Sequence, residues 1–584
     1  MIYDFSFSNT SKDESFFLYI LAQSAQNLHL NAFFYTHNQQ THCFIPDLAA
    51  LLSTQEDSPS HNLLQSFCKQ DINYAQNILA FANDMAQNLP LSLYFAFLEL
   101  KPITPPQAFY EALNTLQPQA SLKEIFTHTF RLLFPQCPKD TPLNDHLHII
   151  ASFHTPKTYY YTPAQTSEIL NPLHEHFAKL NPPSAVHKKL LEKDKAYFIN
   201  IVNELKAGKD VPFCTTFGTK LLSLAPKEDT HTTLLCDIAS LKTYFRTHQA
   251  RIDILASFEK PTTRLVPKEV FESQFPLDKC GLTQVGLPYD MPLAIIGALL
   301  LQDEIGYFFL SPCDKEPDFD FKHSQRPITQ NLAIAQNGIF IDTYITPDNT
   351  LHSLIESHLK AEPGEACLVA YLSSRHPSAF LIQREGSKIL LNIAFETNPR
   401  LILEDIARSY KSGDELLKNF GKHFPELLSA ALNMPPTPKP SNNLLDILDS
   451  AAFVLGLKTP HQSTSDKNAL FYHAYRFVRE RGPRIDYKLL REDNTLLLDY
   501  NRIIRSCMSF KCAKMEDEIL SFGALDSLSE FVATLARDTL TNLALNKILL
   551  LGDMLSNHIF LDKILEYLPK NIQLLLPKDG LIDY

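Results

Sequence analysis

The chain has 584 residues, of which 45% are hydrophobic and 20% are charged, and its formal net charge at pH 7 is −12. Such a length can bury several hydrophobic cores, and a prior of roughly 150 residues per domain predicts about four domains. The excess of acidic side chains argues against nucleic acid as the main partner, because nucleic acids are bound through basic surfaces.

The N-terminal sequence Met1-Ile2-Tyr3-Asp4 is acidic, and no basic segment leads into an apolar core there. We therefore expect no signal peptide. The longest apolar run, from Met291 to Leu301, is too short to span a bilayer. These features predict a cytoplasmic protein without a membrane span.

Ten cysteines are scattered along the chain, and no Cys-x-x-Cys sequence occurs. The pattern indicates neither a disulfide framework nor a zinc finger, so zinc is not expected. Cys507 and Cys512 are the closest pair, and we interpret them as thiols packed on a helix.

Residues 1–101 mix segments of helical and extended pattern. Helices are predicted over Phe16 to Leu21 and around Phe81 to Leu89, and the alternation from Leu91 to Leu98 predicts a strand. An α+β domain follows from this mixture. Proline clusters then predict exposed connections at residues 102–106, 181–184 and 434–441.

Residues 102–185 are predicted to be a helical connector. The segment contains a single cysteine, Cys137, so a four-cysteine zinc site cannot form in it. Its histidines show no ligand spacing, and we interpret them as solvated or hydrogen-bonded side chains: His146, His148, His154, His174 and His176.

The region from about 516 to 546 predicts a long helix with one apolar stripe. Such a stripe is typical of core packing rather than of a groove for a partner. It is formed by Leu525, Leu528, Val532, Leu535 and Leu543.

Residues 547–580 predict a strand, a loop, a helix and a second strand. A short apolar run ends at Gly552, and an apolar face at helical spacing follows on Phe560, Ile564 and Leu568. The helix would direct free N–H groups at the loop. The second strand, Ile572 to Leu576, would close a βαβ unit, and ligands of open α/β sheets bind at such strand ends. This is the layout of a nucleotide site.

At these residues the chain resembles the HypF family, the carbamoyltransferases of [NiFe] hydrogenase maturation. The loop from Gly552 to Asn557 is similar to the family's Gly-Gly-Val-Phe-Gln-Asn, and residues 577–580 are similar to its Pro-Asn-Asp-Gly-Gly. The resemblance implies nucleotide binding at Gly552 and Asn557 and a metal ligand at Asp579. Asp553 replaces the second glycine, and its carboxylate would repel a phosphate.

The resemblance extends over most of the chain and implies a multi-domain α/β fold with an α+β N-terminal part. Its parts would be an acylphosphatase-like domain, a connector, a YrdC-like domain and a shortened ASKHA-type transferase domain. The corresponding ranges are 1–101, 102–185, 186–345 and 346–584.

In the YrdC-like segment the most specific string is Val285-Gly286-Leu287-Pro288-Tyr289-Asp290-Met291-Pro292-Leu293. By resemblance, four basic residues would meet a triphosphate. The alternative is that they form a solvated basic rim. The four are Lys206, Lys209, Lys220 and Arg251.

Several of the family's functional motifs are missing. The phosphate-binding arginine of the first domain has no counterpart, and the helix there begins Lys12-Asp13-Glu14. The His-His-His-Ala-His motif is absent, and the proline segment at 435–440 stands in its place. Asp579 is therefore a single carboxylate, and we expect the metal site to be vestigial.

Retained folds with lost charged residues resemble the HydE-type accessory proteins, which are related to HypF. The resemblance implies a role in maturation or expression of [NiFe] hydrogenase, with hydrogenase subunits or other maturation proteins as partners. We expect lost or weakened chemistry rather than an enzyme.

Two alternatives remain open. The first is an active carbamoyltransferase that supplies the precursor of the cyanide ligand and uses ATP with Mg²⁺. The second is a structural protein with no link to hydrogenase.

Overall fold

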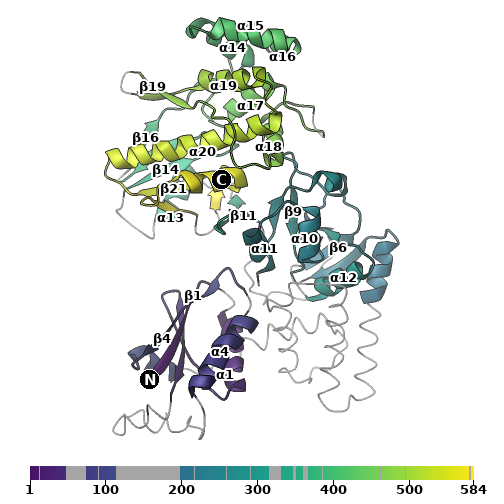
Figure 1. The fold of residues 1–584 in the computed structure, drawn as a ribbon, viewed down its shortest axis with the longest axis vertical. Helices are drawn as coiled ribbons and strands as arrows, with labels where there is room; N and C mark the ends of the chain where they lie inside the picture. The colour runs from purple at the N-terminus through teal and green to yellow at the C-terminus, as the bar shows by residue number, and fades with distance from the viewer. Residues whose placement is uncertain are drawn as a thin grey trace. The chain divides into compact units, whose positions relative to one another are not determined.

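A computed structural model describes residues 1–11, 14–47, 51, 74–89, 91–113, 198–215, 218–257, 259–289, 291–314, 331–345, 350–359, 366–384, 386–460, 463–492, 495–577 and 581–584. The chain forms two compact units. Unit 1 comprises residues 1–262, 269–276 and 284–329, and unit 2 comprises 263–268, 277–283 and 330–584. Each unit is described by itself (Figure 1).

Unit 1 begins with a split βαβ arrangement. Its sheet has the order β2-β3-β1-β4, and all described neighbours in it are antiparallel. Helices α1 and α4 follow the first and third strands of the chain and contact each other. The elements are β1 (Ile2–Asn9), α1 (Glu14–Asn27), β2 (Phe33–His37), β3 (Gln40–Pro46), α4 (Tyr74–Asn88) and β4 (Phe95–Ile103).

Alternation places the two sets of side chains of β1 on opposite faces of this sheet. Phe5 packs edge-on against Phe81 of α4, with ring centroids 5.0 Å apart. Phe95 of β4 stacks on Phe17 of α1 at 4.6 Å. On the other face Ile2 packs with Phe109 of α5 (Gln107–Leu113). Apolar residues on both faces thus fix this α+β part.

The predicted strand from Leu91 to Leu98 is wrong in its bounds, because β4 begins at Phe95 and continues to Ile103. Pro102, which was expected in an exposed connection, lies in this strand opposite Tyr3. A proline is tolerated there because β4 is an outer strand of the sheet as far as the described residues go, and the missing N–H can face away from the ladder.

The second part of unit 1 is a mixed sheet with the order β9-β7-β10-β6-β5. Only the β7–β9 pair is parallel, and β5–β6, β6–β10 and β10–β7 are antiparallel. Its strands are β5 (Val211–Thr215), β6 (Gly218–Ser223), β7 (Thr232–Leu235), β9 (Thr283–Gly286) and β10 (Tyr307–Pro312). Its helices are α10 (Ile238–Tyr244), α11 (Gln249–Ala256), η2 (Glu269–Gln274) and α12 (Met291–Gln302), and residues 198–206 are also helical.

Unit 2 has a central sheet with the order β16-β15-β14-β21-β22. Strands β14, β21 and β22 are parallel, and β15 and β16 are antiparallel additions. The strands are β14 (Cys367–Tyr371), β15 (Ala379–Gln383), β16 (Ser387–Leu391), β21 (Lys547–Leu551) and β22 (Gln573–Leu575).

The helices of unit 2 contribute to its large core, except α13, which packs in a smaller cluster with β14 and β21. They are α13 (Leu351–Leu359), α14 (Pro399–Ser409), α15 (Gly413–His423), α16 (Pro425–Leu432), α17 (Asp446–Leu455), α18 (Lys467–Arg476), α19 (Tyr500–Cys512), α20 (Asp517–Asn542) and α21 (His558–Tyr567).

Shorter strands complete unit 2. β8 (Thr263–Leu265), β11 (Leu332–Ile334) and β12 (Phe340–Asp342) follow one another in a ladder, and β13 (Tyr344–Ile345) pairs in parallel with β23 (Leu581–Asp583). Two small antiparallel pairs are β17 (Phe395–Glu396) with β18 (Pro440–Ser441), which are separated in the chain by three helices, and the hairpin of β19 (Lys488–Glu492) with β20 (Thr495–Asp499).

Helix α20 confirms the predicted long helix and most of its stripe. Leu525, Leu528, Val532 and Leu535 are buried, whereas Leu543 is 48% exposed and lies beyond the helix end. The stripe ended too late in the prediction because the helix stops at Asn542. Among the described helices, α20 alone is long and apolar enough to cross a membrane. Most of its apolar segment is buried inside the protein.

The predicted βαβ unit is confirmed by β21, α21 and β22, with β21 and β22 parallel. One expectation about it is wrong. The helix does not direct free N–H groups at the loop, because the Asn557 side chain accepts from the N–H groups of Ile559 and Phe560. A capping amide has satisfied the donors that a phosphate would use.

Candidate functional site

The parallel strands β14 and β21 end side by side in unit 2, and their following loops meet. Tyr371 lies opposite Leu551 in the ladder. Beyond the strands the Leu372 N–H donates to the Leu551 carbonyl at 2.9 Å, and the Met554 N–H donates to the Leu372 carbonyl at 3.1 Å. Polar residues at such a junction define the candidate site, which is the usual ligand position in open α/β sheets.

Gly552 makes this junction sterically possible. Its φ is +103°, and a Cβ atom added there would lie 1.9 Å from the Leu372 carbonyl oxygen. Its N–H donates to the Ile582 carbonyl at 2.6 Å. A side chain at this position is therefore excluded by both conformation and space.

The next residue, Asp553, turns its carboxylate onto the loop that follows β14. The Ser374 N–H donates to Asp553 Oδ1 at 2.7 Å, and the Ser374 hydroxyl donates to the other carboxylate oxygen. Burial is the main cause that raises the pKa of Asp553, and the two hydrogen bonds from Ser374 oppose it. The donors of the loop are thus occupied by an acid of the chain itself.

A second acid, Asp583, is fully buried beneath the same loop. It accepts hydrogen bonds from the Tyr371 hydroxyl and, at 2.8 Å, from the Ser373 hydroxyl. Arg375 Nη2 lies 3.3 Å from Asp583 Oδ2. Burial, followed by the hydrogen bond to Asp583, raises the pKa of Tyr371. Asp583 therefore fixes the start of the loop that carries Ser374.

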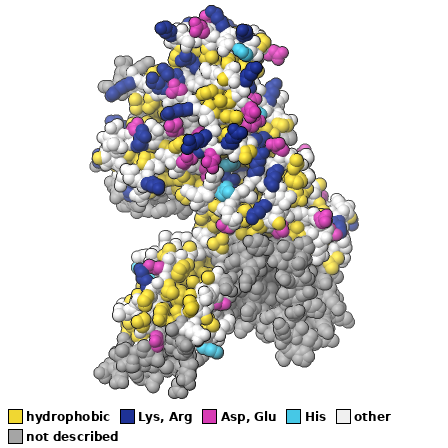
Figure 2. Space-filling model, viewed as in Figure 1, with side chains coloured by type: hydrophobic (Ala, Val, Ile, Leu, Met, Phe, Trp, Pro, Cys, Tyr) yellow, Lys and Arg dark blue, Asp and Glu magenta, His cyan; other side chains and the backbone are white. Residues whose placement is uncertain are grey.

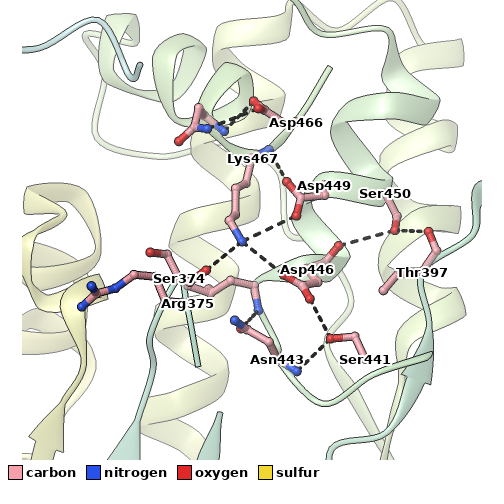
Figure 3. A network of polar contacts seen from close by, with 12 residues as sticks. Ser374, Arg375, Thr397, Ser441, Asn443, Asp446, Asp449, Ser450, Asp466 and Lys467 are labelled. Atoms are coloured by element: carbon pink, nitrogen blue, oxygen red, sulfur yellow. Dashed lines mark hydrogen bonds and ion pairs between the residues drawn. The ribbon is translucent and has the colours of Figure 1, made fainter. Parts of the chain in front are cut away.

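Lys467 brings an ammonium group to the site, in addition to the Arg375 guanidinium (Figure 3). Lys467 Nζ lies 3.1 Å from both the Ser374 carbonyl oxygen and Asp446 Oδ1, and 3.6 Å from Asp449 Oδ2. Its side chain is only 16% exposed. The Lys467 N–H also donates to Asp449 Oδ1 at 2.7 Å. The ammonium thus joins two carboxylates to the loop.

Local sequence explains how α17 and α18 bring these groups together. Asp446 and Asp449 lie three residues apart at the start of α17, so their side chains share one face of the helix. Asp466 caps α18 by accepting from the N–H groups of Asn468 and Ala469, which places Lys467 at the first helical position. Burial raises the pKa of Asp449, and the Lys467 N–H and ammonium oppose that rise.

The predicted site residues are divided between the units. Gly552 and Asn557 lie in one loop of unit 2, where Asn557 Nδ2 is a buried donor without a hydrogen-bond partner in the described structure. The remaining four, Lys206, Lys209, Lys220 and Arg251, belong to unit 1. Asp579 lies outside the described residues.

The four predicted basic residues of unit 1 differ in their ion-pair partners and in their burial. Lys206 Nζ lies 2.8 Å from Asp303, and Lys209 Nζ lies 3.5 Å from Glu204. Lys220 is half-buried on β6, and Arg251 is buried on α11. Their role in binding a triphosphate stays a prediction.

Sequence reasoning missed Ser374, Asp583 and Lys467. A usable signal existed for Ser374, since an apolar run of strand length, residues 367–372, is followed directly by Ser-Ser-Arg-His-Pro. Lys467 carries no such signal, because its partners lie about 20 and 90 residues away in sequence. Among the described residues, no group of three His, Cys, Asp or Glu side chains is placed to hold a metal ion.

The chain is similar in sequence to a known protein over most of its length. The chain is 31% identical over 536 residues to protein HydE of Wolinella succinogenes, and the match covers 87% of this chain and 91% of the relative. No protein-family profile matches the chain.

The solved structures that match this chain include two HypF structures. The crystal structure of T. kodakarensis HypF matches 100% of this chain and 96% of its own, with a TM-score of 0.53 and 11% identity. Full-length HypF in its phosphate- and nucleotide-bound form matches 66% of this chain and 84% of its own, with a TM-score of 0.46 and 13% identity. The fold class predicted from the motifs is confirmed by the T. kodakarensis structure.

Proposed function

This chain belongs to the HydE family, and from that premise we propose that it is an accessory protein of [NiFe] hydrogenase maturation, without carbamoyltransferase turnover. The hydrogenase link rests on the motifs shared with the HypF family and on the HypF-like fold. Its partners would be hydrogenase subunits or other maturation proteins in the cytoplasm.

The observation that carries the proposal is the position of the Asp553 carboxylate. A phosphate group needs N–H and O–H donors free to turn toward it. Here the Ser374 N–H and hydroxyl donate to Asp553 instead. A phosphate brought near this carboxylate would meet like-charge repulsion, roughly 4 kcal/mol for two unit charges 4 Å apart near a protein surface.

The charge of the surrounding residues supports the same conclusion. Asp446, Asp449, Asp553 and Asp583 are acids of this site, whereas Lys467 and Arg375 are its bases. Lys467 is already bound by Asp446 and the Ser374 carbonyl, so it is not free to neutralise a triphosphate. A site with more acids than bases disfavours an anionic substrate.

The second candidate function is an active, ATP-dependent carbamoyltransferase. Two observations favour it. Gly552 keeps the tight backbone approach that a phosphate loop needs, and Asn557 retains a buried amide donor without a hydrogen-bond partner in the described residues. Under this alternative, ATP with Mg²⁺ would bind only after Asp553 leaves Ser374.

Deletion and complementation in the host separate the two functions. Loss of this protein should lower [NiFe] hydrogenase activity, and the wild-type chain and the Lys209→Ala variant should restore it equally. Lys227→Ala is a matched control, because Lys227 forms a surface ion pair with Asp210 in the same unit. Hydrogenase activity unchanged by deletion would contradict the role in maturation, and loss of complementation by Lys209→Ala alone would favour the enzyme.

A further inference from the structure

Strand β4 is an outer strand of the first sheet of unit 1, and among the described strands only β1 pairs with it. Its side chains are unusually apolar for an exposed strand: Phe97 is 46% exposed, Leu98 50% and Leu100 39%. Figure 2 shows hydrophobic side chains gathered over this part of unit 1, where Figure 1 places β1 and β4. An unpaired apolar edge is a template for another strand.

The proline at the end of this strand indicates which backbone groups face outward. Pro102 has no N–H, and it lies opposite Tyr3 in the ladder with β1. Proline is accommodated at an edge when its nitrogen faces away from the ladder. Backbone orientation alternates along a strand, so the N–H and C=O groups of Leu100 also face outward.

We propose that two copies of this chain pair through β4, antiparallel and about a twofold axis at Leu100. In this register the two Leu100 residues exchange both backbone hydrogen bonds. Glu99 then lies directly opposite Lys101 of the second copy, and Lys101 lies opposite Glu99 of the second copy. Glu99 and Lys101 form an exposed ion pair within one strand, with Lys101 Nζ 2.6 Å from Glu99 Oε1. The pairing would also set each of them beside the opposite charge of the second copy, and opposite charges across a strand pair are stabilising.

The same register continues the apolar face of the sheet. Leu100 lies opposite Phe5, so the two side chains share a face, and Phe5 packs against Phe81 of α4. The two Leu100 side chains would meet at the axis and extend that core across the pair. Apolar burial and charge complementarity thus favour one register.

The irregularities of β4 limit the pairing to a closed dimer. A register shift in the ladder with β1 leaves Leu98 as an extra residue between Glu99 and Phe97. Such a bulge, together with the missing N–H of Pro102, interrupts pairing on either side of Leu100. A twofold contact uses the same surface on both copies, so it closes after two.

Charge reversal tests the register directly. The full chain should show a monomer–dimer equilibrium in sedimentation velocity at micromolar concentration, since one added strand pair buries little area. Glu99→Lys or Lys101→Glu alone gives residues 99 and 101 the same charge, so each dimer would contain two like-charge pairs across the interface. Each single variant should weaken the dimer about tenfold. The double variant restores opposite charges and should recover the wild-type affinity.

Two further variants complete the experiment. Leu100→Lys places two ammonium groups at the axis and should abolish the dimer by a route independent of the charged pair. Asp414→Lys with Lys418→Asp reverses an exposed ion pair on α15 and should leave the dimer unchanged. Circular dichroism verifies that each variant is folded. A monomer at every concentration, or single reversals that keep the wild-type affinity, would overturn the proposal.

Discussion

At the scale of single residues, the account depends on Asp553. Its carboxylate stands where the similar HypF motif has a glycine, and it holds the loop after β14 through the Ser374 N–H and hydroxyl. It is buried, and its pKa is raised mainly for that reason. The residue therefore both closes the loop and costs stability in its ionised form.

Two substitutions separate these effects. Asp553→Ala should destabilise unit 2 by about 1–3 kcal/mol, because the Ser374 donors lose their acceptor. Asp553→Asn keeps an acceptor for the Ser374 N–H and removes the buried charge, so its stability at pH 7 should be close to or above wild type. Urea unfolding of both variants measures the difference, and an Asn variant as unstable as the Ala variant would contradict this account.

The pH dependence has a definite sign. Because the folded pKa of Asp553 is raised above the unfolded value, the folded state favours the protonated acid. The stability gained from this protonation is complete below the unfolded pKa and is lost as pH rises through the folded pKa. As pH falls from 7 toward 4, wild type should thus gain stability relative to Asp553→Asn. The difference in unfolding free energy between the two proteins, measured at several pH values, checks this sign.

Gly552 makes a steric prediction. Gly552→Ala should cost about 3 kcal/mol or more, since the backbone is in the left-handed half of φ space and the added Cβ meets the Leu372 carbonyl. Gly386→Ala is the control, because no atom lies within 4 Å of a Cβ there. Equal unfolding midpoints for the two variants would refute the steric account.

At the scale of elements, the long helix α20 organises unit 2. It contacts α18, α19 and α21, and its apolar residues are buried along most of its length. Leu528 is 1% exposed, whereas Leu543, beyond the helix end, is 48% exposed. Burial along the helix therefore changes sharply at its C-terminal end.

Alanine substitution measures this contrast. Leu528→Ala should destabilise the protein by about 2–5 kcal/mol through lost burial and a cavity. Leu543→Ala should change the free energy of unfolding by less than about 0.5 kcal/mol, as surface substitutions do. Similar losses at both positions, measured by urea unfolding, would show that the helix is not packed as described.

Periodicity predicted α20 and the β21–α21–β22 unit because both are long apolar patterns read within one local segment. It misplaced the end of the stripe at Leu543 and the start of β4, because ends depend on local caps and on pairing with β1 rather than on period. The cap at Asn557 overturned the expectation that the start of α21 presents free N–H groups to a phosphate. The local sequence showed the residue but not that its side chain satisfies the helix donors.

The candidate site was predicted only in part, because several of its residues lie far apart in the sequence. Gly552, Asp553 and Asn557 are neighbours in sequence, and their motif identified the loop. Ser374, Asp583 and Lys467 come from separate segments that only the fold of unit 2 brings to the same strand ends. Long-range polar contacts of this kind leave no periodic signal.

At the scale of the whole molecule, the chain has a HypF-like fold, and its site at the ends of β14 and β21 holds more acidic than basic side chains. The T. kodakarensis HypF structure matches the entire chain at 11% identity, which shows the fold and not the chemistry. We propose that the chain has this fold without carbamoyl transfer, because the Asp553 carboxylate occupies the Ser374 donors in the loop that a nucleotide would need.

Carbamoyl-phosphate-dependent exchange of pyrophosphate into ATP tests this claim most directly. The purified wild-type chain should be measured beside Lys209→Ala and Asp579→Ala, with a HypF protein as the positive control and circular dichroism to show that each protein is folded. The account predicts no exchange above background from the folded wild-type chain. Exchange that requires Lys209 would contradict it and establish a surviving adenylate step.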